Sequence, residues 1–356
     1  MKTSFLSFLM MFFCFFSVQA QKKSWREVIF KSDDVWYQSE EAKLIADNVL
    51  IYQRDIGGWP KNLEMQNKIS SSEITSLEAL KKDPNGCTID NGATVQEMIF
   101  LSKVYQFHPE EKYKFGFIRG LLYLITSQYK NGGWPQFYPL KEGYYTHITF
   151  NDDAMVNVLS LFKEIAENKK FNAIEIGDDL VNKVKSSLQK GIDVILKTQY
   201  KQNGVLTAWC AQHEKETLLP AKARAYELES LSGKESAKIV LFLMSIQHPS
   251  NEIKVAIQSA VEWFEKSKIE GYKLETVTIG NKKQVDKILV EAMDAEPMWA
   301  RFMELDNNRP FFCDRSGKKK YSIAEISLER RMGYGWYTYE PKEVLKKYKA
   351  WKEKHF

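Results

Sequence analysis

The sequence has few of the side chains that carry disulfide, metal and acid–base chemistry. Among 356 residues there are four cysteines and five histidines. Cys87, Cys210 and Cys313 follow the N-terminal segment, and their odd number and spacing match neither a disulfide framework nor a metal site. We expect three small buried thiols. A Walker loop, a nucleophile elbow and a zinc-type histidine pair are also missing. His147 and His213, both in loop contexts, are the few candidates for histidine catalysis.

Long hydrophobic runs are absent except at the N-terminus. Lys2 precedes an apolar run from Phe5 to Val18, which closes with the small-x-small cleavage site "VQA". This order predicts a secretory signal peptide over 1–20, cleaved after Ala20, and therefore a secreted or periplasmic protein. An N-terminal membrane anchor is the alternative, although the run is short for a spanning helix.

Linkers and low-complexity stretches are missing after the signal peptide, so we expect 21–356 to form a single domain. The formal net charge of +5 falls to +4 (5 − 1) when Lys2 is removed. This mild excess suits an acidic partner better than a basic one. We expect a monomer that binds neither nucleic acid nor, after signal cleavage, a membrane.

Strand signals are few, and "LETVTI" near 273–279 is the clearest. Helical periodicity is widespread, for example over Ala93–Phe107 and from Ala154 onward. One element occurs repeatedly: "GLLYLITSQYKNGGWPQFY" from Gly120 aligns without a gap with "GIDVILKTQYKQNGVLTAW" from Gly191, although the latter lacks the Trp-Pro. "ADNVLIYQRDIGGWPKN" is a looser copy, and "AVEWFEKSKIEGYKLE" is a weaker fourth.

The helix that follows this element is repeated as well. "DNGATVQEMIFLSKVY" from Asp90 aligns with "NDDAMVNVLSLFKEIA" from Asn151, and the segment from Ala223 is a candidate third copy. Such repeats stack because one hairpin cannot bury its apolar face alone. Gly-Gly at a helix end permits a left-handed cap, and the Trp then packs inward. We predict an all-α fold, an (α/α) toroid with a cleft built from loops and few short strands; an open α-solenoid is the alternative.

Both copies of the second helix begin with adjacent polar residues, "DNG" from Asp90 and "NDD" from Asn151. Ordinary N-capping accounts for one such residue at each place but not for two or three. If the repeats pack side by side, Asp90, Asn91, Asp152 and Asp153 meet at one end. Clustered carboxylates and amides suit Ca²⁺, so calcium binding and plain capping both remain open on spacing alone.

Basic residues gather near aromatic ones in two loop-rich stretches: Lys222, Arg224, Arg301, Arg309 and Arg315. Arg301 and Arg315 lie around a loop with Asn, Pro and Gly, where a planar guanidinium can grip a carboxylate with two hydrogen bonds. Arg330 and Arg331 fit charges on a solvated helix face better. Carboxylate-binding arginines beside an acidic cluster indicate a polyanionic substrate.

Six blocks in order carry a resemblance to a known family: "GGWPKN", "TIDNGAT", "NGGWPQFYP", "YYTHITFNDDAM", "LLPAKARAYELESLSGKES" and "WARFMELDNNRPFFCDRSG" with the following "YSIAEISLERRMGYGWY". They resemble the pectate lyases of polysaccharide lyase family 10 over essentially the whole mature chain. The resemblance implies an α/α toroid that cleaves polygalacturonate by β-elimination with calcium.

The same resemblance implies roles for single residues. Asp90, Asn91 and Asp152 match the calcium and substrate-carboxylate cluster, with Asn91 in both roles. Arg315 matches the base that removes the C5 proton, and Arg301 and Arg224 match arginines that bind substrate carboxylates.

Lys222, in the same block as Arg224, is expected to bind substrate too. Because guanidinium has a pKa above roughly 12, an arginine base predicts an alkaline activity optimum.

Two other functions stay open on the sequence alone. An inverting glycoside hydrolase needs two carboxylates about 6.5–9.5 Å apart, and Asp90 with Asp152 could serve. A non-catalytic binder of acidic polysaccharide would keep the fold without turnover. The product distinguishes the three functions, since only a lyase leaves a 4,5-unsaturated sugar end.

Overall fold

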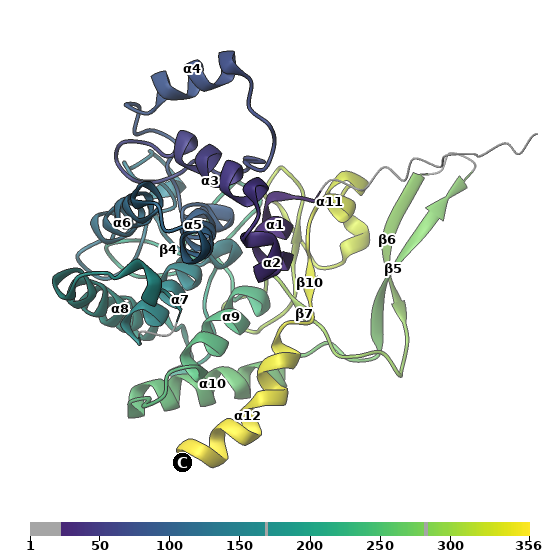
Figure 1. Cartoon of the computed structure of the whole chain (residues 1–356). Helices are drawn as coiled ribbons and strands as arrows, with labels where there is room; N and C mark the ends of the chain where they lie inside the picture. The colour runs from purple at the N-terminus through teal and green to yellow at the C-terminus, as the bar shows by residue number, and fades with distance from the viewer. Residues whose placement is uncertain (1–22, 168–169, 281–283) are drawn as a thin grey trace, which may run out of the picture.

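The computed structural model describes residues 23–167, 170–280 and 284–356 (Figure 1). The predicted signal peptide lies outside this part of the chain. The α-helices are α1 (Trp25–Lys31), α2 (Asp34–Tyr37), α3 (Glu40–Tyr52), α4 (Ser71–Leu80), α5 (Val95–Phe107), α6 (Glu111–Thr126), α7 (Ala154–Ala166), α8 (Asp178–Thr198), α9 (Gly233–Met244), α10 (Asn251–Ser267), α11 (Leu328–Gly333) and α12 (Pro341–His355). In the described residues none of these helices has the length and apolar character needed to cross a bilayer.

The long helices pack in two rows. Helices α3, α6, α8 and α10 contact one another in that order, and α5, α7 and α9 form the second row. Consecutive helices join the rows, as α5 does with α6 and α7 with α8, and α12 packs on α9 and α10. The apolar periodicity explains this arrangement: in α8, buried side chains recur every three or four residues from Val184 to Thr198.

A buried tryptophan fixes each repeat. The indole N–H donates to a carbonyl of the helix before it in four places: Trp59 to Val49 (2.8 Å), Trp134 to Leu124 (2.7 Å), Trp209 to Ile195 (2.8 Å) and Trp299 to Phe264 (2.8 Å). All four rings are fully buried. A buried indole N–H needs such a partner. In each repeat this bond holds the segment that follows the helix against the helix itself. The predicted repeat is confirmed.

The expectation that the copy from Gly191 lacks its tryptophan is wrong. A short hairpin, β2 (Lys201–Gln202) with β3 (Val205–Leu206), is inserted after the helix. Trp209 then reaches the position that Trp134 occupies in the preceding repeat. A gapless alignment pairs the wrong residues because the insertion delays the tryptophan.

A second repeated contact explains the glutamines and glycines of the copies. The amides of Gln53, Gln128 and Gln199 each donate to a carbonyl in their own loop and to one in the next helix of the row. Gly132 has φ +101°, and a Cβ there would lie 2.0 Å from the carbonyl oxygen of Lys190. The left-handed turn predicted from Gly-Gly is therefore required by close packing on the next helix.

The predicted all-α toroid is corrected by the strands and by the order of the helix contacts. The described residues contain ten strands in five separate antiparallel pairs: β1 (Ile148–Thr149) with β4 (Gln212–His213), β2 with β3, β5 (Tyr272–Ile279) with β6 (Gln284–Glu291), β7 (Trp299–Ala300) with β10 (Tyr337–Thr338), and β8 (Phe312–Cys313) with β9 (Lys319–Lys320). Between residues 268 and 340 the fold consists mostly of loops and strands, and β5–β6 stands out from the body in Figure 1. The extensive helix contacts of the described chain do not join α10 or α12 to α3, so they show two packed rows and no closed ring.

Two apolar cores support these parts. The large one lies between the helix rows, and a smaller one holds the strand-rich C-terminal part together: Phe302, Phe311, Phe312, Cys313, Ile323, Ile326 and Trp336. The three cysteines are free and buried, as predicted. The smaller core matters for function because its loops carry most of the predicted arginines.

A buried carboxyl group ties the N-terminal helix to the body. Glu97 in α5 is 2% exposed, and its Oε1 accepts from the indole of Trp25 at 2.8 Å. Its Oε2 is buried, and none of the described residues forms a hydrogen bond with it. Burial raises the pKa of Glu97 from 4.5 to about 7, although the Trp25 bond opposes this.

We predict that Glu97 makes the folded state less stable as pH rises. Between pH 4.5 and about 7 the unfolded chain loses this proton while the folded chain retains it. The free energy of unfolding should therefore fall through this window, by roughly 3 kcal/mol, and change little above it. Glu97→Gln should remove that slope. Urea unfolding of both proteins at pH 4.5 and pH 8 measures it, and parallel profiles would disprove the assignment.

Candidate active site

Two backbone turns of unusual shape place the predicted acidic residues. The 3₁₀ turns Asp90–Gly92 and Asn151–Asp153 precede α5 and α7, and they pack against each other. Asn91 has φ +52° and Asp152 has φ +50°, a left-handed conformation at the same point of both repeats. Asn and Asp tolerate this conformation better than other side chains with a Cβ. Plain N-capping is not the explanation, since no side-chain cap bond forms at either helix start.

The third repeat supplies a carboxylate that sequence reasoning missed. In each repeat a backbone N–H donates to the carbonyl of the repeat tryptophan: Thr88 to Trp59 (3.1 Å), Thr149 to Trp134 (3.2 Å) and Ser232 to Trp209 (2.9 Å). Within three residues after each donor lies a carboxylate: Asp90, Asp152 and Glu235. Trp209 is the sequence feature that could have revealed this carboxylate, because counting onward from the tryptophan gives the start of the third helix.

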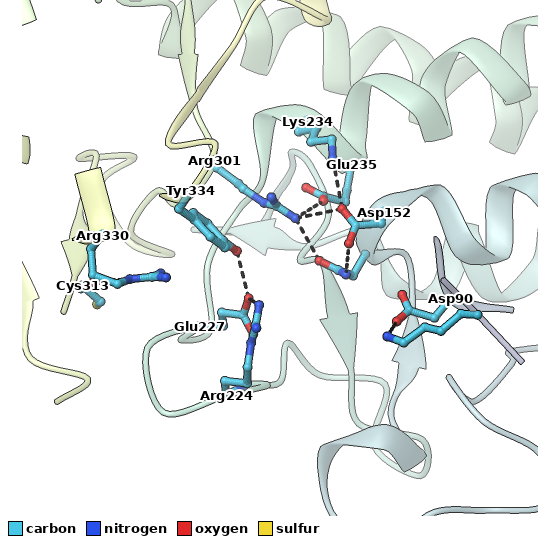
Figure 2. A network of polar contacts seen from close by, with 12 residues as sticks. Asp90, Asp152, Arg224, Glu227, Lys234, Glu235, Arg301, Cys313, Arg330 and Tyr334 are labelled. Atoms are coloured by element: carbon cyan, nitrogen blue, oxygen red, sulfur yellow. Dashed lines mark hydrogen bonds and ion pairs between the residues drawn. The ribbon is translucent and has the colours of Figure 1, made fainter. Parts of the chain in front are cut away.

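Arg301 joins these turns to the C-terminal loops. It follows β7 and is 8% exposed. Its Nη2 donates to Glu235 Oε1 at 3.0 Å, to Asn151 Oδ1 at 2.9 Å and to Asp152 Oδ1 at 3.4 Å (Figure 2). A second cation, Lys234, donates to Asp152 Oδ1 at 3.1 Å. Two cations and two carboxylates thus form a charge-balanced network, in which Arg301 and Glu235 are buried and Lys234 and Asp152 are half-buried.

The pKa values in this network follow from its charges. Burial on its own would raise the pKa of Asp152, but Arg301 and Lys234 outweigh it and lower that pKa. Burial would likewise lower the pKa of Arg301, but Glu235 and Asp152 raise it. Both groups are therefore ionised at neutral pH. Asp153 differs, because burial raises its pKa and its Oδ1 is buried without a partner.

Asp90 lies at the other end of the cluster. Asp90 is 2% exposed, and its Oδ2 accepts from Lys61; within the described part of the chain its buried Oδ1 has no hydrogen-bond partner. The exposed Asn91 donates from its amide to Asn62 at 2.8 Å. The structure thus brings Asp90, Asn91 and Asp152 together on two touching turns, and each of the two carboxylates is already paired with a lysine.

The arginines surround two tyrosines. Tyr226 has three guanidinium groups near its ring, with centroid distances of 5.0 Å to Arg224, 5.5 Å to Arg315 and 4.3 Å to Arg330. Tyr334 has Arg301 at 4.8 Å and Arg330 at 4.7 Å. Each distance is short enough for attraction between a cation and the ring face. We call these four arginines and two tyrosines the arginine cluster.

Arg301 connects the arginine cluster to the two 3₁₀ turns that carry Asp90 and Asp152, which we call the acid turns, because it contacts both Tyr334 and Asp152. The Tyr334 hydroxyl donates to Glu227 at 2.9 Å, and Glu227 accepts from Arg224 Nε at 2.7 Å (Figure 2). Gly317, two residues after Arg315, has φ +74°, and a Cβ there would lie 2.3 Å from the carbonyl oxygen of Ala225. The Arg315 loop is therefore packed closely on the loop that carries Arg224.

Arg224 and Arg315 differ from Arg301 in exposure. Both are exposed, and each pairs with a carboxylate of its own: Arg315 donates to Glu329 at 2.6 and 3.1 Å. The hydrogen bonds that Arg224 donates to Glu227 and Arg315 donates to Glu329 raise the pKa of the two guanidinium groups. Lys222 is exposed, and among the described residues it forms no hydrogen bond or ion pair.

The interpretation of Arg330 as a solvated charge is wrong. Arg330 is 4% exposed, its ring contacts place it between Tyr226 and Tyr334, and its Nη2 is buried without a partner. Arg331 is half-buried and pairs with Asp286 at 2.6 Å. The missed signal was the aromatic sequence "YGWY" that begins three residues after Arg331, which predicts rings against which a guanidinium can pack.

This arrangement, carboxylates on two touching turns beside arginines held on tyrosine rings, is that of a protein acting on a polyanionic chain. A profile of the pectic acid lyase family matches residues 53–345. A family 10 polysaccharide lyase from Cellvibrio cellulosa is 38% identical, with a TM-score of 0.76 over 92% of this chain and 94% of that one. A variant of that lyase in complex with trigalacturonic acid matches equally well, over 92% and 95%. No curated protein matches the chain.

The chain therefore belongs to the pectic acid lyase family, and the resemblance found in the sequence is confirmed. It is a pectate lyase, an enzyme of polysaccharide degradation.

We predict that Arg301 depends on Glu235 for its burial. Glu235→Gln removes the charge that faces a guanidinium almost inaccessible to water, so unfolding should become easier by about 3–5 kcal/mol. Glu329→Gln is the matched control, because it breaks an arginine–carboxylate pair whose side chains are 62% and 57% exposed. Urea denaturation should show a large shift for the first variant and none for the control. Equal shifts would contradict the buried network.

Proposed function

We propose that the arginine cluster binds carboxylates of polygalacturonate next to Asp90 and Asp152, and that Arg315 cleaves the chain by β-elimination. The observation that carries this proposal is the arrangement of four guanidiniums around Tyr226 and Tyr334, which continues into the acid turns through Arg301. Planar guanidiniums recognise carboxylates with two parallel hydrogen bonds. The polymer offers one carboxylate per sugar, which matches a row of such groups.

The roles of the arginines differ with their burial. Arg301 is held by Glu235, Asn151 and Asp152, so it orients the site as much as it binds substrate. Arg224 is exposed beside Glu227 and can turn its free edge toward a uronate. We assign Arg224 and Arg301 to carboxylate binding, with Lys222 and Asn91 as further polar contacts at the exposed surface of the same site.

The elimination requires one proton to be removed and one bond to break. Neutral Arg315 takes the proton from C5, the electron pair forms the C4–C5 double bond, and the C4–O4 bond breaks. The departing oxygen gains a proton and becomes the new hydroxyl end, while the other product carries a 4,5-unsaturated sugar. Positive groups around the C6 carboxylate stabilise the charge that develops next to it.

The pairing of Arg315 with Glu329 opposes this chemistry in the free protein. The carboxylate raises the pKa of Arg315 and therefore keeps the guanidinium protonated. Nearby cations in the arginine cluster act in the opposite direction. We infer that Glu329 must release Arg315 when the substrate binds, and that the fraction of active base rises with pH.

Calcium fits this site in part. Asp90 and Asp152 are hard oxygen donors on touching turns, and Asp90 has a buried oxygen with no hydrogen-bond partner. In the described residues no three acidic, histidine or cysteine side chains are grouped to hold a metal alone. We propose that Asp90, Asn91 and Asp152 hold Ca²⁺ together with substrate carboxylates. The ion would supply positive charge that acidifies the C5 proton.

We also propose that the chain acts outside the cytoplasm, as a monomer, after cleavage behind Ala20. The support is the N-terminal order of charge, apolar run and small residues, together with a substrate too large to enter a cell. An inverting hydrolase is disfavoured, because it needs one protonated carboxylic acid, whereas Arg301 and Lys234 lower the pKa of Asp152.

We predict that Arg315→Ala and Arg315→Lys slow product formation by about 10²–10⁴-fold, the usual contribution of a positioned base. Ultraviolet absorbance of the unsaturated product on polygalacturonate measures the rate. Arg309→Ala is the matched control, since Arg309 is also exposed and stacks on a ring, Tyr321, at 3.8 Å.

Glu329→Gln should move the pH profile of the same reaction toward lower pH, because Arg315 then loses its proton more easily. Full activity of Arg315→Ala would disprove the assignment of the base, and an unchanged profile in Glu329→Gln would disprove the proposed release.

We predict that calcium binds weakly to the free protein and more tightly when trigalacturonate is present. Isothermal titration of Ca²⁺ with and without the trisaccharide should show this difference, and chelation should abolish the ultraviolet signal. Asp152→Asn keeps the shape of the side chain and removes its charge, so it should weaken the calcium heat at saturating trisaccharide. Calcium binding unaffected by Asp152→Asn would exclude this residue as a ligand.

A further inference from the structure

The loop between Gln136 and Thr146 carries aromatic rings and a lysine that the site described above does not use. Phe137, Tyr144 and Tyr145 are partly exposed, and Lys141 is exposed. In the primary sequence these rings are indistinguishable from core residues. Single exposed rings are common on a protein surface, but several grouped in one loop are typical of a binding surface.

This loop is fastened to the segment that carries Asp90. Thr88 pairs with Phe137 as an antiparallel bridge, and Ile89 N–H donates to the Gln136 carbonyl at 3.3 Å. The two ends of the loop are also joined, since Gln136 N–H donates to the Tyr145 carbonyl at 3.0 Å. The rings therefore have a fixed backbone beside an acid turn, which preorganises a binding surface.

The rings form one continuous surface. The centroids of Phe137 and Tyr145 are 5.3 Å apart, and those of Tyr144 and Tyr145 are 4.0 Å apart. Lys141 Nζ lies 5.3 Å from the Phe137 ring and 4.4 Å from the Tyr145 ring. We call Phe137, Lys141, Tyr144 and Tyr145 the aromatic loop.

Lys141 differs from the lysines of the acid turns. Lys61 and Lys234 each pair with a carboxylate, Asp90 and Asp152 respectively. Over the described ranges Lys141 has no ion-pair partner, so its charge is held in place by rings alone. A positioned cation without a counter-charge attracts an anionic ligand.

The aromatic loop lies beside the acid turns. Lys61 connects it to the acid turns, because its Nζ pairs with Asp90 and also lies 5.7 Å from the Phe137 ring. A polymer bound at the acid turns therefore passes next to these rings.

We propose that the aromatic loop is an additional sugar-binding subsite, in which the ring of Tyr144 packs on the apolar face of a galacturonate and Lys141 pairs with its carboxylate. This inference rests on the proposed function, since it assigns one more sugar of the same polymer. A pyranose ring has a face of C–H groups that loses water when it packs on an aromatic ring. The pairing of a flat ring with a lysine selects a sugar that is both apolar on one face and anionic.

The test compares substrates of different length with the intact mature protein. Tyr144→Leu removes the flat ring but retains apolar volume, and Lys141→Ala removes the exposed charge. We expect each to raise KM for polygalacturonate roughly three- to tenfold, with kcat changed by less than about twofold. Tyr144→Phe should keep the wild-type KM, and Lys141→Arg should raise KM much less than Lys141→Ala does. The effect of Lys141→Ala should shrink at high salt.

The length dependence separates this subsite from the rest of the site. The rise in KM should disappear for the shortest oligogalacturonide that is cleaved, because that substrate does not reach the aromatic loop. Tyr272→Ala, a substitution of an exposed tyrosine on β5, is the control and should leave KM unchanged at every length. Equal KM for Tyr144→Leu and wild type on the polymer, or an equal loss on all lengths, would overturn the proposal. If the proposed function itself fails, wild-type protein releases no unsaturated product, which is a different result.

Discussion

The buried pairing of Arg301 with Glu235 is the interaction on which the site depends. One guanidinium contacts residues from two repeats of helices and comes itself from the strand-rich C-terminal part. Neither group could be buried alone, because an unpaired charge in the interior costs several kcal/mol. A charge pair therefore fixes the position of the helical repeats relative to the strand-rich C-terminal part. The acid turns face the arginine cluster for that reason.

Much of the helical scaffold could be predicted from the sequence, because the Trp and Gly positions recur and the apolar period is regular. The third acidic position could not, since an inserted hairpin shifts Trp209 and hides Glu235 from a gapless alignment. The strand signal "LETVTI" is confirmed by β5, but β7 to β10 were missed because each is two residues long, too short for an alternating pattern. Arg330 was misjudged, because burial of an arginine depends on rings such as Tyr226 that are distant in sequence.

In the free protein most charges of the site already have partners from the chain itself. Lys61 forms an ion pair with Asp90, Glu227 with Arg224, and Glu329 with Arg315. An anionic substrate therefore exchanges one ion pair for another, so the net gain of each contact is smaller than its strength in isolation. Such a site discriminates by matching the spacing of several carboxylates, which a polymer satisfies and a single small acid does not.

The repeated bond between an indole and the helix before it has an evolutionary consequence. The chain between donor and acceptor spans ten residues at Trp59 and Trp134, fourteen at Trp209 and thirty-five at Trp299. Lengthening a loop adds little closure entropy. Segments such as the β5–β6 hairpin can therefore be inserted between a helix and its tryptophan without moving the helices. The scaffold is thus open to innovation at these four points, where descendants of this chain can gain new surfaces while the catalytic geometry stays the same.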